Sequence, residues 1–133
     1  MDEQRWAVSA KAVVMDASRV LLLQNDRGDW ELPGGRVDAD DASIESALAR
    51  EVEEEAGLVA EVGRVCHAEI FAQVGDGRQV IIVAYDARVS ATGVTISDEH
   101  VGAAWVALDA LAEIDLPAVY HRAIEAAPRS QMP

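Results

Sequence analysis

Apolar positions along the chain fall into short runs that are separated by turn-forming residues. Residues 6–15 and 19–24 are two such runs, and the Asp-Ala-Ser between them is prone to turn, so both are predicted to be β-strands. A short extended stretch, 30–33, then leads into a pair of glycines. The N-terminal third is therefore predicted to be mostly β-structure.

The second half of the chain repeats this alternation. Residues 60–74 and 78–89 flank Gly-Asp-Gly, which is a strong hairpin signal. Residues 103–108 predict a last short strand, and 109–114 and 116–127 predict helices. Strands dominate both halves, with one helix between them, so the simplest architecture is a mixed sheet with helices on its faces. We expect a single domain over residues 1–133, in which residues 127–133 form a frayed tail.

The central helix has clear start and stop signals. Asp40, Asp41 and Ser43 are N-cap candidates, and Gly57 is placed to end the helix. At about 100° per residue, one stripe of the helix is apolar. That stripe consists of Ile44, Ala47, Leu48 and Val52.

Four glutamates crowd the last turns of this helix, in the stretch Arg-Glu-Val-Glu-Glu-Glu-Ala-Gly-Leu. Glu51 and Glu55 continue the apolar stripe, Glu54 borders it, and Glu53 points to the opposite side. Carboxylates on an inward face need compensation, which a hard divalent cation with oxygen ligands supplies. The alternative is an amphipathic helix whose last turns protrude beyond the core.

Composition narrows the range of ligands. The net charge of −13 and the lack of any Lys/Arg cluster argue against binding to long nucleic acid. A small phosphorylated ligand stays possible if metal ions supply positive charge. Cys66 is the only cysteine, so it cannot form an intramolecular disulfide, and its apolar surroundings predict a buried, inert thiol. Neither a membrane-spanning segment nor a signal peptide is recognisable, so a soluble cytoplasmic protein is expected.

The segment from the two glycines to Leu58 resembles the Nudix box, the signature of the Nudix (MutT-like) hydrolases. The second half of that box reads Arg-Glu-apolar-any-Glu-Glu-any-Gly-apolar, and every defined position is matched. The matching residues are Arg50, Glu51, Val52, Glu54, Glu55, Gly57 and Leu58. The preceding Trp-Glu-Leu-Pro-Gly-Gly is also typical of the family. The resemblance implies the Nudix fold, an α/β fold in which a mixed sheet is sandwiched between helices (α/β/α).

The first half of the box departs from the family pattern. The chain has one residue more than the pattern between Gly35 and Arg50, and the expected first glutamate is missing. Asp40 or Asp41 is the nearest substitute, and Asp38 stands where many members have a glutamate. In the family that first glutamate mainly supports the motif arginine. A shorter carboxylate in a longer loop is therefore expected to weaken activity rather than abolish it.

The resemblance implies a hydrolase that cleaves a pyrophosphate bond with Mg²⁺, or sometimes Mn²⁺. Carried over from the family, Glu51, Glu54 and Glu55 would be metal ligands, and the carbonyl of Gly35 would complete the site. Arg50 would orient Glu51 or Glu54. The general base would be one of those two glutamates.

Two further positions have open interpretations. Glu99 is an outside candidate for the base or for an extra metal ligand, and an exposed polar turn containing Glu99 and His100 explains the sequence equally well. His67 and Glu69 lie on a predicted strand and could line the cleft, although the polar outer face of a strand is the preferred interpretation.

The expected substrate is a nucleoside diphosphate linked to another group. A nucleoside triphosphate, cleaved to monophosphate and pyrophosphate, is favoured because the chain is compact, and the protein is expected to act as a monomer or homodimer. ADP-ribose, a nucleotide sugar, a non-catalytic nucleotide-binding sensor and an acidic partner-binding domain are the alternatives. Trp30, Phe71 and Tyr85 could stack on a base, but each is more often a core residue.

Overall fold

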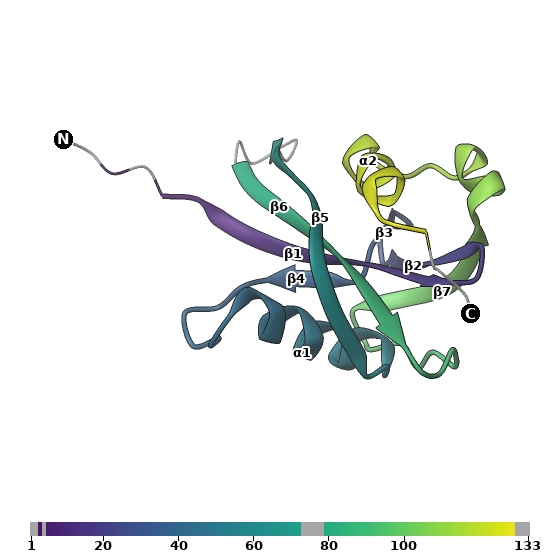
Figure 1. Ribbon diagram of the computed structural model, residues 1–133, viewed down its shortest axis with the longest axis horizontal. Helices are drawn as coiled ribbons and strands as arrows, with labels where there is room; N and C mark the ends of the chain where they lie inside the picture. Colours follow the sequence, from purple (N-terminus) through teal and green to yellow (C-terminus); the bar gives the residue numbers. More distant parts are fainter. Residues whose placement is uncertain (1–2, 4, 73–78, 130–133) are drawn as a thin grey trace.

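A computed structural model describes residues 3, 5–72 and 79–129 (Figure 1). Its strands, in chain order, are β1 (Ala7–Asp16), β2 (Arg19–Asn25), β3 (Trp30–Glu31), β4 (Gly34–Arg36), β5 (Ala60–Ala72), β6 (Gln79–Val89) and β7 (His100–Ala107). The helices are α1 (Ile44–Ala56), the 3₁₀ helix η1 (Leu108–Glu113) and α2 (Ala118–Ala126).

Strand β1 is the centre of a mixed sheet. It pairs in parallel with β6, from Ala7 opposite Val80 onwards, and antiparallel with β2 and β4. Strand β5 pairs antiparallel with β6, and β2 pairs antiparallel with β3 and β7. The predicted mixed sheet is confirmed.

Helices cover the two faces of this sheet, as Figure 1 shows with α1 below and α2 above. Alternating residues of β1 serve the two layers, since Ala12 and Val14 pack with α1 whereas Val13 packs with α2 and η1. Each layer is closed by fully buried side chains, such as Leu48 from α1 and Ile124 from α2. The predicted arrangement of helices on either side of the sheet is therefore confirmed.

Helix α1 begins and ends as its sequence predicts. Ser43 is the N-cap, and its hydroxyl accepts a hydrogen bond from the backbone N–H of Ser46 at 3.0 Å. Gly57 ends the helix with a φ of 69°, a left-handed conformation that favours glycine. The two caps fix the register of the helix, and so fix which glutamates face inward.

Other boundaries differ from the sequence prediction. Strand β7 begins at His100 rather than at residue 103, because His100 pairs with Asn25 across a bulge. Residues 108–113 form a 3₁₀ helix instead of an α-helix. The predicted Gly-Asp-Gly turn lies outside the described residues, as does most of the predicted tail. Within the described ranges, the helices are all too short or too polar to cross a bilayer.

Candidate active site

The glutamates of α1 point in the directions that their helical spacing predicts. Glu55 is 6% exposed and Glu51 is half-buried, whereas Glu53 and Glu54 are exposed. Glu51 and Glu55 continue the face on which Leu48 and Val52 are buried, on the side of the helix that meets the sheet. A purely solvated charge run would have left both outside.

The turn from Leu32 to Gly35 lies against these two carboxylates. The backbone N–H of Gly34 donates a hydrogen bond to Glu55 Oε1 at 2.9 Å. A Cβ atom built on Gly35 would lie 2.9 Å from the Cδ atom of Glu51, so only glycine lets this carboxylate approach the backbone so closely. Strand β4 and helix α1 therefore bring together Gly35, Glu51 and Glu55, three of the residues expected in the metal site.

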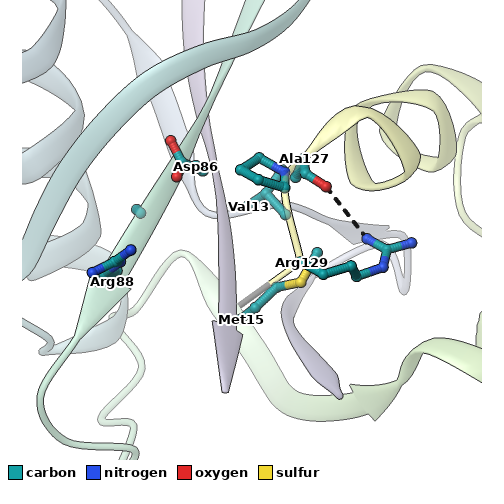
Figure 2. Close-up of a pocket in the computed structure, with 8 residues that line it drawn as sticks. Val13, Met15, Asp86, Arg88, Ala127 and Arg129 are labelled. Atoms are coloured by element: carbon teal, nitrogen blue, oxygen red, sulfur yellow. Dashed lines mark hydrogen bonds between the residues drawn. The ribbon is translucent and has the colours of Figure 1, made fainter. Parts of the chain in front are cut away.

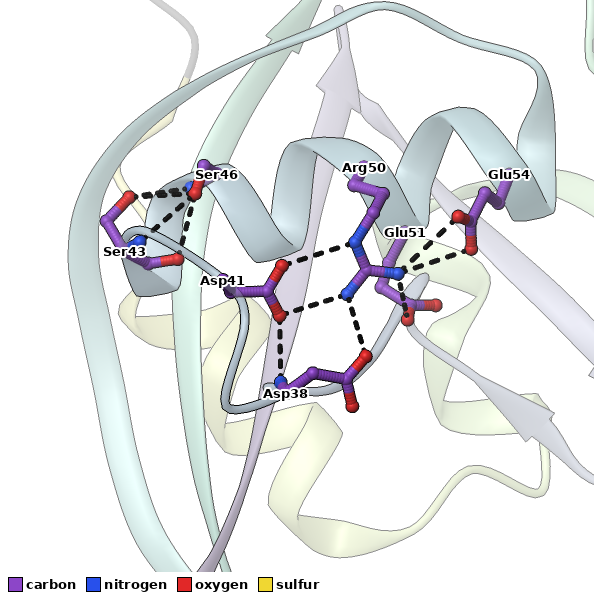
Figure 3. A network of polar contacts seen from close by, with 7 residues as sticks. All are labelled: Asp38, Asp41, Ser43, Ser46, Arg50, Glu51 and Glu54. Carbon is purple, nitrogen blue, oxygen red and sulfur yellow. Dashed lines mark hydrogen bonds and ion pairs between the residues drawn. The ribbon is translucent and has the colours of Figure 1, made fainter.

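Arg50 is the centre of a polar network on the outer side of the site (Figure 3). Its guanidinium donates to both carboxylate oxygens of Asp41, at 3.1 and 3.3 Å, and to Glu51 Oε1 at 3.1 Å. It also lies 3.4 Å from Glu54 and 3.7 Å from Asp38. The arginine thus connects the loop before α1 with two of the motif glutamates, as the resemblance implies.

Asp41 is the one of the two candidate substitutes for the missing first glutamate that contacts Arg50. Its carboxylate also accepts the backbone N–H of Asp38 at 2.8 Å, and that bond, together with the Arg50 guanidinium, lowers the pKa of Asp41. Asp40 is exposed, and no ion pair joins it to Arg50 in the described part of the chain. The side chain that contacts Arg50 is therefore that of Asp41. An aspartate is one carbon shorter than a glutamate, and the longer loop brings its carboxylate within hydrogen-bonding distance of the arginine.

Substitution of Asp41 by asparagine tests this support. Loss of the bidentate ion pair should free Arg50 to reorient, and we expect kcat for nucleotide hydrolysis to fall by about 10- to 100-fold, which is typical of residues that orient metal ligands. Asp40→Asn makes the same chemical change one residue earlier and should leave kcat unaltered. Equal rates for both variants would contradict the role of Asp41.

Burial changes the acidity of the inward carboxyl groups. Burial raises the pKa of Glu55 to about 7, although the Gly34 N–H and the nearby charge of Lys11 oppose the shift. Burial also raises the pKa of Glu51, against the opposing effect of Arg50. The negative charge of Glu51 raises the pKa of Glu55 further. A cation bound between them would relieve this repulsion.

The raised pKa of Glu55 predicts how stability depends on pH. The folded state holds a proton on Glu55 up to about pH 7, whereas the unfolded chain releases it near pH 4.5. The contribution of this group to the free energy of unfolding is therefore complete below pH 4.5 and is lost as the pH rises through 7. Glu69, with a pKa lowered to about 2, changes stability only at more acidic pH.

Urea unfolding in EDTA at several pH values between 4.5 and 8 measures this effect. We expect the stability of the wild type relative to Glu55→Gln to decrease across that range, because glutamine does not titrate. A relative stability that rises with pH would contradict the raised pKa.

The donor set suits a hard divalent cation in its chemistry. Glu51, Glu54 and Glu55 supply carboxylate oxygens, which Mg²⁺ and Mn²⁺ prefer, and two of these groups are desolvated and repel each other. Within residues 5–72 and 79–129, however, no three His, Cys, Asp or Glu side chains stand close enough to hold a metal as they are placed. Arg50 instead supplies the positive charge beside Glu51 and Glu54. The metal ligands stay a prediction.

Glu99 and His100, the two candidate residues before and at the start of β7, lie in different surroundings. Glu99 lies in an exposed turn, as the alternative interpretation has it, and after burial its charge is one of the causes that raise the pKa of Glu51; its role as ligand or base stays a prediction. His100 is not part of an exposed turn, since its side chain is buried and its Nε2 lies 2.9 Å from Glu31 Oε2. Sequence reasoning missed this pair, because an isolated Glu at a strand end carries no distinguishing signal.

His67 and Glu69 belong to a different network. Glu69 receives a bidentate pair from Arg122 of α2, at 2.7 and 2.8 Å, and lies 2.6 Å from His67 Nε2. These contacts tie α2 to β5. The arrangement agrees with the preferred interpretation that both residues belong to the polar face of a strand, here partly covered by α2.

A pocket of about 260 Å³ lies next to the glycine turn and is lined by aromatic and polar side chains. Trp30, Phe71 and Tyr120 provide its aromatic surfaces, and Glu31 also lines it.

Tyr85 is 4% exposed and packs in the core on the α1 side, so the stacking role considered for it is wrong. A smaller cavity of about 110 Å³, between β6 and the end of α2, has Asp86 and Arg88 in its lining but none of the α1 glutamates (Figure 2).

Comparison with known proteins agrees with this geometry. The sequence model of the family described as NUDIX domain matches residues 5–127. A "MutT-like protein" of Streptomyces ambofaciens is 30% identical over 105 residues, which are 78% of this chain and 65% of that protein. The chain thus spans about two thirds of the length of that relative.

Solved structures show the same fold. The MutT protein of Methanosarcina mazei Go1 superposes with a TM-score of 0.80 at 30% identity, over 94% of each chain. An ADP-ribose pyrophosphatase of Streptococcus suis superposes with a TM-score of 0.72 at 28% identity, over 95% of this chain and 94% of that one.

Proposed function

The chain belongs to the NUDIX family, and from that premise we propose that it hydrolyses a pyrophosphate bond in a nucleoside diphosphate linked to another group. The observation that carries the proposal is the contact of Glu55 and Glu51 with the glycine turn, next to the Arg50 network. A degenerate, non-catalytic relative would be expected to have lost part of this set, and here all three motif glutamates and the arginine are present.

We propose Mg²⁺, or Mn²⁺, as the cofactor, held by Glu51, Glu54 and Glu55 with the carbonyl of Gly35 and with Glu99 as an outer candidate. When bound, the ion supplies charge stabilisation on the phosphates and lowers the pKa of the attacking water. Residues of the chain would orient these ligands and accept the proton. Arg50, fixed by Asp41, would orient Glu51 and Glu54, and one of these two carboxylates would accept the proton that water loses as its oxygen bonds to phosphorus. The bond from that phosphorus to the bridging oxygen would break, and the other phosphate would leave with that oxygen.

The pocket lined by Trp30, Phe71 and Tyr120 is the proposed place for the part of the substrate that does not react. Its aromatic faces suit a planar base, and its volume of about 260 Å³ is just below the usual range for ligand pockets. Glu31, which lines the pocket, immediately precedes the glycine turn, and we place the phosphates of a bound nucleotide at that turn.

Two substrate classes are supported by the relatives. A nucleoside triphosphate, cleaved to monophosphate and pyrophosphate, is the leading candidate because the two relatives at 30% identity are named MutT or MutT-like. ADP-ribose is the second candidate, because the Streptococcus suis relative at 28% identity is an ADP-ribose pyrophosphatase. Both substrates have the same diphosphate group, which the motif helix would contact in the same way.

A nucleotide panel assayed with and without Mg²⁺ tests the proposal. Pyrophosphate with a nucleoside monophosphate identifies the triphosphate reaction, whereas AMP with ribose 5-phosphate identifies the ADP-ribose reaction. Failure to turn over any member of the panel, combined with tight nucleotide binding, would favour a sensor and refute the hydrolase.

A further inference from the structure

Lys11 is the only lysine of the sequence, and its position is unusual for that residue type. It lies in the middle of the central strand β1 and is 7% exposed. It alternates with Ala10 and Ala12, which pack towards α1, so its side chain enters the layer on the side of α2. Lysine is almost never this deeply buried without partners that compensate its charge.

Every donor of the ammonium group has an acceptor or an aromatic face. Lys11 Nζ donates to the carbonyl oxygens of Leu32, at 3.2 Å, and Gly34, at 3.3 Å. It also lies 5.7 Å from the centroid of the Tyr120 ring, within the range of a cation–π contact. The carbonyl between these two, that of Pro33, accepts the backbone N–H of Ala12 at 2.9 Å. Three consecutive carbonyls of the turn are thus bound to β1 or to its lysine.

The same turn is held from the opposite layer by α1. Gly34 accepts from Lys11 through its carbonyl oxygen and donates to Glu55 through its N–H. Its φ of 136° is a conformation that only glycine adopts readily. These two bonds hold the backbone of Gly34 in that conformation. The turn that faces the catalytic carboxylates is therefore clamped between a lysine on one side and a glutamate on the other.

The charge on Lys11 matches its surroundings. Burial lowers its pKa, but the combined effect of nearby groups, chiefly Tyr120, Glu31 and Glu55, is larger and raises the pKa overall. The ammonium therefore stays protonated. A lysine suits this position better than an arginine, because it is a compact charge with three donors rather than a wide planar fork.

We propose that Lys11 is a positioning residue for the hydrolytic site: its ammonium group fixes the Leu32–Gly34 carbonyls, and thereby holds the Gly34 N–H on Glu55 and Gly35 against Glu51. Tyr120 lines the aromatic pocket and contacts the Lys11 ammonium, so Lys11 also connects that pocket with the glycine turn. The inference rests on the proposed function for its kinetic consequences, and on geometry alone for its structural ones.

Lys11→Met tests the proposal by kinetics. Methionine fills a similar volume but has neither charge nor N–H donors. We expect kcat to fall by about 10- to 100-fold, as for a misplaced catalytic group, with KM for the nucleotide changed by less than about threefold. Lys11→Arg keeps charge and donors, and its kcat should exceed that of Lys11→Met. A kcat that is equal in the two variants would overturn the proposal.

A matched control distinguishes a positioning role of Lys11 from one in stability alone. Val20 is fully buried on the neighbouring strand β2 and touches none of the proposed site residues through a hydrogen bond or ion pair in the described structure. Val20→Ala should lower the melting temperature and keep kcat within about twofold of the wild type. If Lys11→Met likewise lost stability but kept kcat, Lys11 would be structural only.

Nuclear magnetic resonance tests the geometry without any substrate. In Lys11→Met, we expect the backbone amide signal of Gly34 to shift, because its bond to Glu55 loosens, while that of Gly93, which no hydrogen bond joins to the glycine turn in the described structure, stays in place. An unmoved Gly34 signal would overturn the proposal. This measurement still decides the question if the wild type proves to hydrolyse no nucleotide.

The wild type alone provides a test that does not depend on a variant folding. Labelling with ¹⁵N-lysine gives a single side-chain signal, since Lys11 is the only lysine. Its ammonium protons should be protected from exchange with water, because they are buried and bound to carbonyls. Exchange as fast as that of a free lysine side chain would contradict the clamp.

Discussion

Replacement of Glu55 by glutamine is expected to abolish most metal-dependent hydrolysis while the fold persists. Glutamine has the same shape, and its carbonyl oxygen can still accept the Gly34 N–H that Glu55 accepts at 2.9 Å. It cannot supply the negative charge that a divalent cation needs. A bound metal provides several kcal/mol of transition-state stabilisation, and each ~1.4 kcal/mol is tenfold in rate, so kcat should fall by at least roughly 100-fold.

Stability should respond in the opposite direction. Burial raises the pKa of Glu55 to about 7, so at pH 8 the group is mostly ionised, and its ionisation costs more free energy in the folded protein than in the unfolded chain. The neutral glutamine removes that cost, so its melting temperature in EDTA at pH 8 should equal or exceed that of the wild type. Added Mg²⁺ should stabilise the wild type more than Glu55→Gln, because the proposed metal site loses one of its carboxylate ligands in the variant.

Glu53→Gln is the matched control for this experiment. Glu53 lies on the same helix and faces solvent, so Glu53→Gln makes the same chemical change outside the site. It should hydrolyse nucleotides at the wild-type rate. If Glu55→Gln were as active as Glu53→Gln, the assignment of metal ligands on α1 would be wrong.

Substitution of Gly34 by alanine is expected to have the largest effect on stability. The residue has a φ of 136°, and a Cβ atom there would lie 2.0 Å from the carbonyl oxygen of Ala10. The obstacle is backbone in the central strand and cannot rotate away. We expect the free energy of unfolding to fall by roughly 3 kcal/mol or more, which is a large part of the stability of a domain of this size.

Gly93→Ala provides the comparison for the same chemical change. A Cβ atom at Gly93 would meet nothing within 4 Å, so that variant should unfold within about 0.5 kcal/mol of the wild type in urea. Should Gly34→Ala be as stable as Gly93→Ala, the turn must have a conformation other than the one seen here.

The inward direction of Glu51 and Glu55 was predictable from sequence, because helical periodicity needs only the order of residues and a register fixed by caps. Ser43 and Gly57 fix that register, and both are recognisable capping residues. The apolar run over residues 6–15 likewise predicted the strand β1, although not its central place in the sheet. Local rules were sufficient at these positions.

Contacts between distant segments were not predictable in the same way. Asp40 and Asp41 are chemically identical and adjacent, and the path of the loop alone decides that Asp41 reaches Arg50. Lys11 in an apolar strand carries no mark of its partners, since the carbonyl of Leu32 comes from the turn between β3 and β4 and that of Gly34 from the start of β4. His100 was ambiguous because its burial depends on the pairing of β7 with β2.

The pairing of β1 also has a consequence for how the protein is made. Residues of β1 leave the ribosome well before their parallel partner β6, which begins only at Gln79. Until that segment has been synthesised, the nascent chain holds an apolar strand with one open edge, and such edges recruit other chains. Long-range pairing of this kind also slows folding. We therefore expect closure of the sheet to be a late event, and shortened translation products that end before β6 to aggregate.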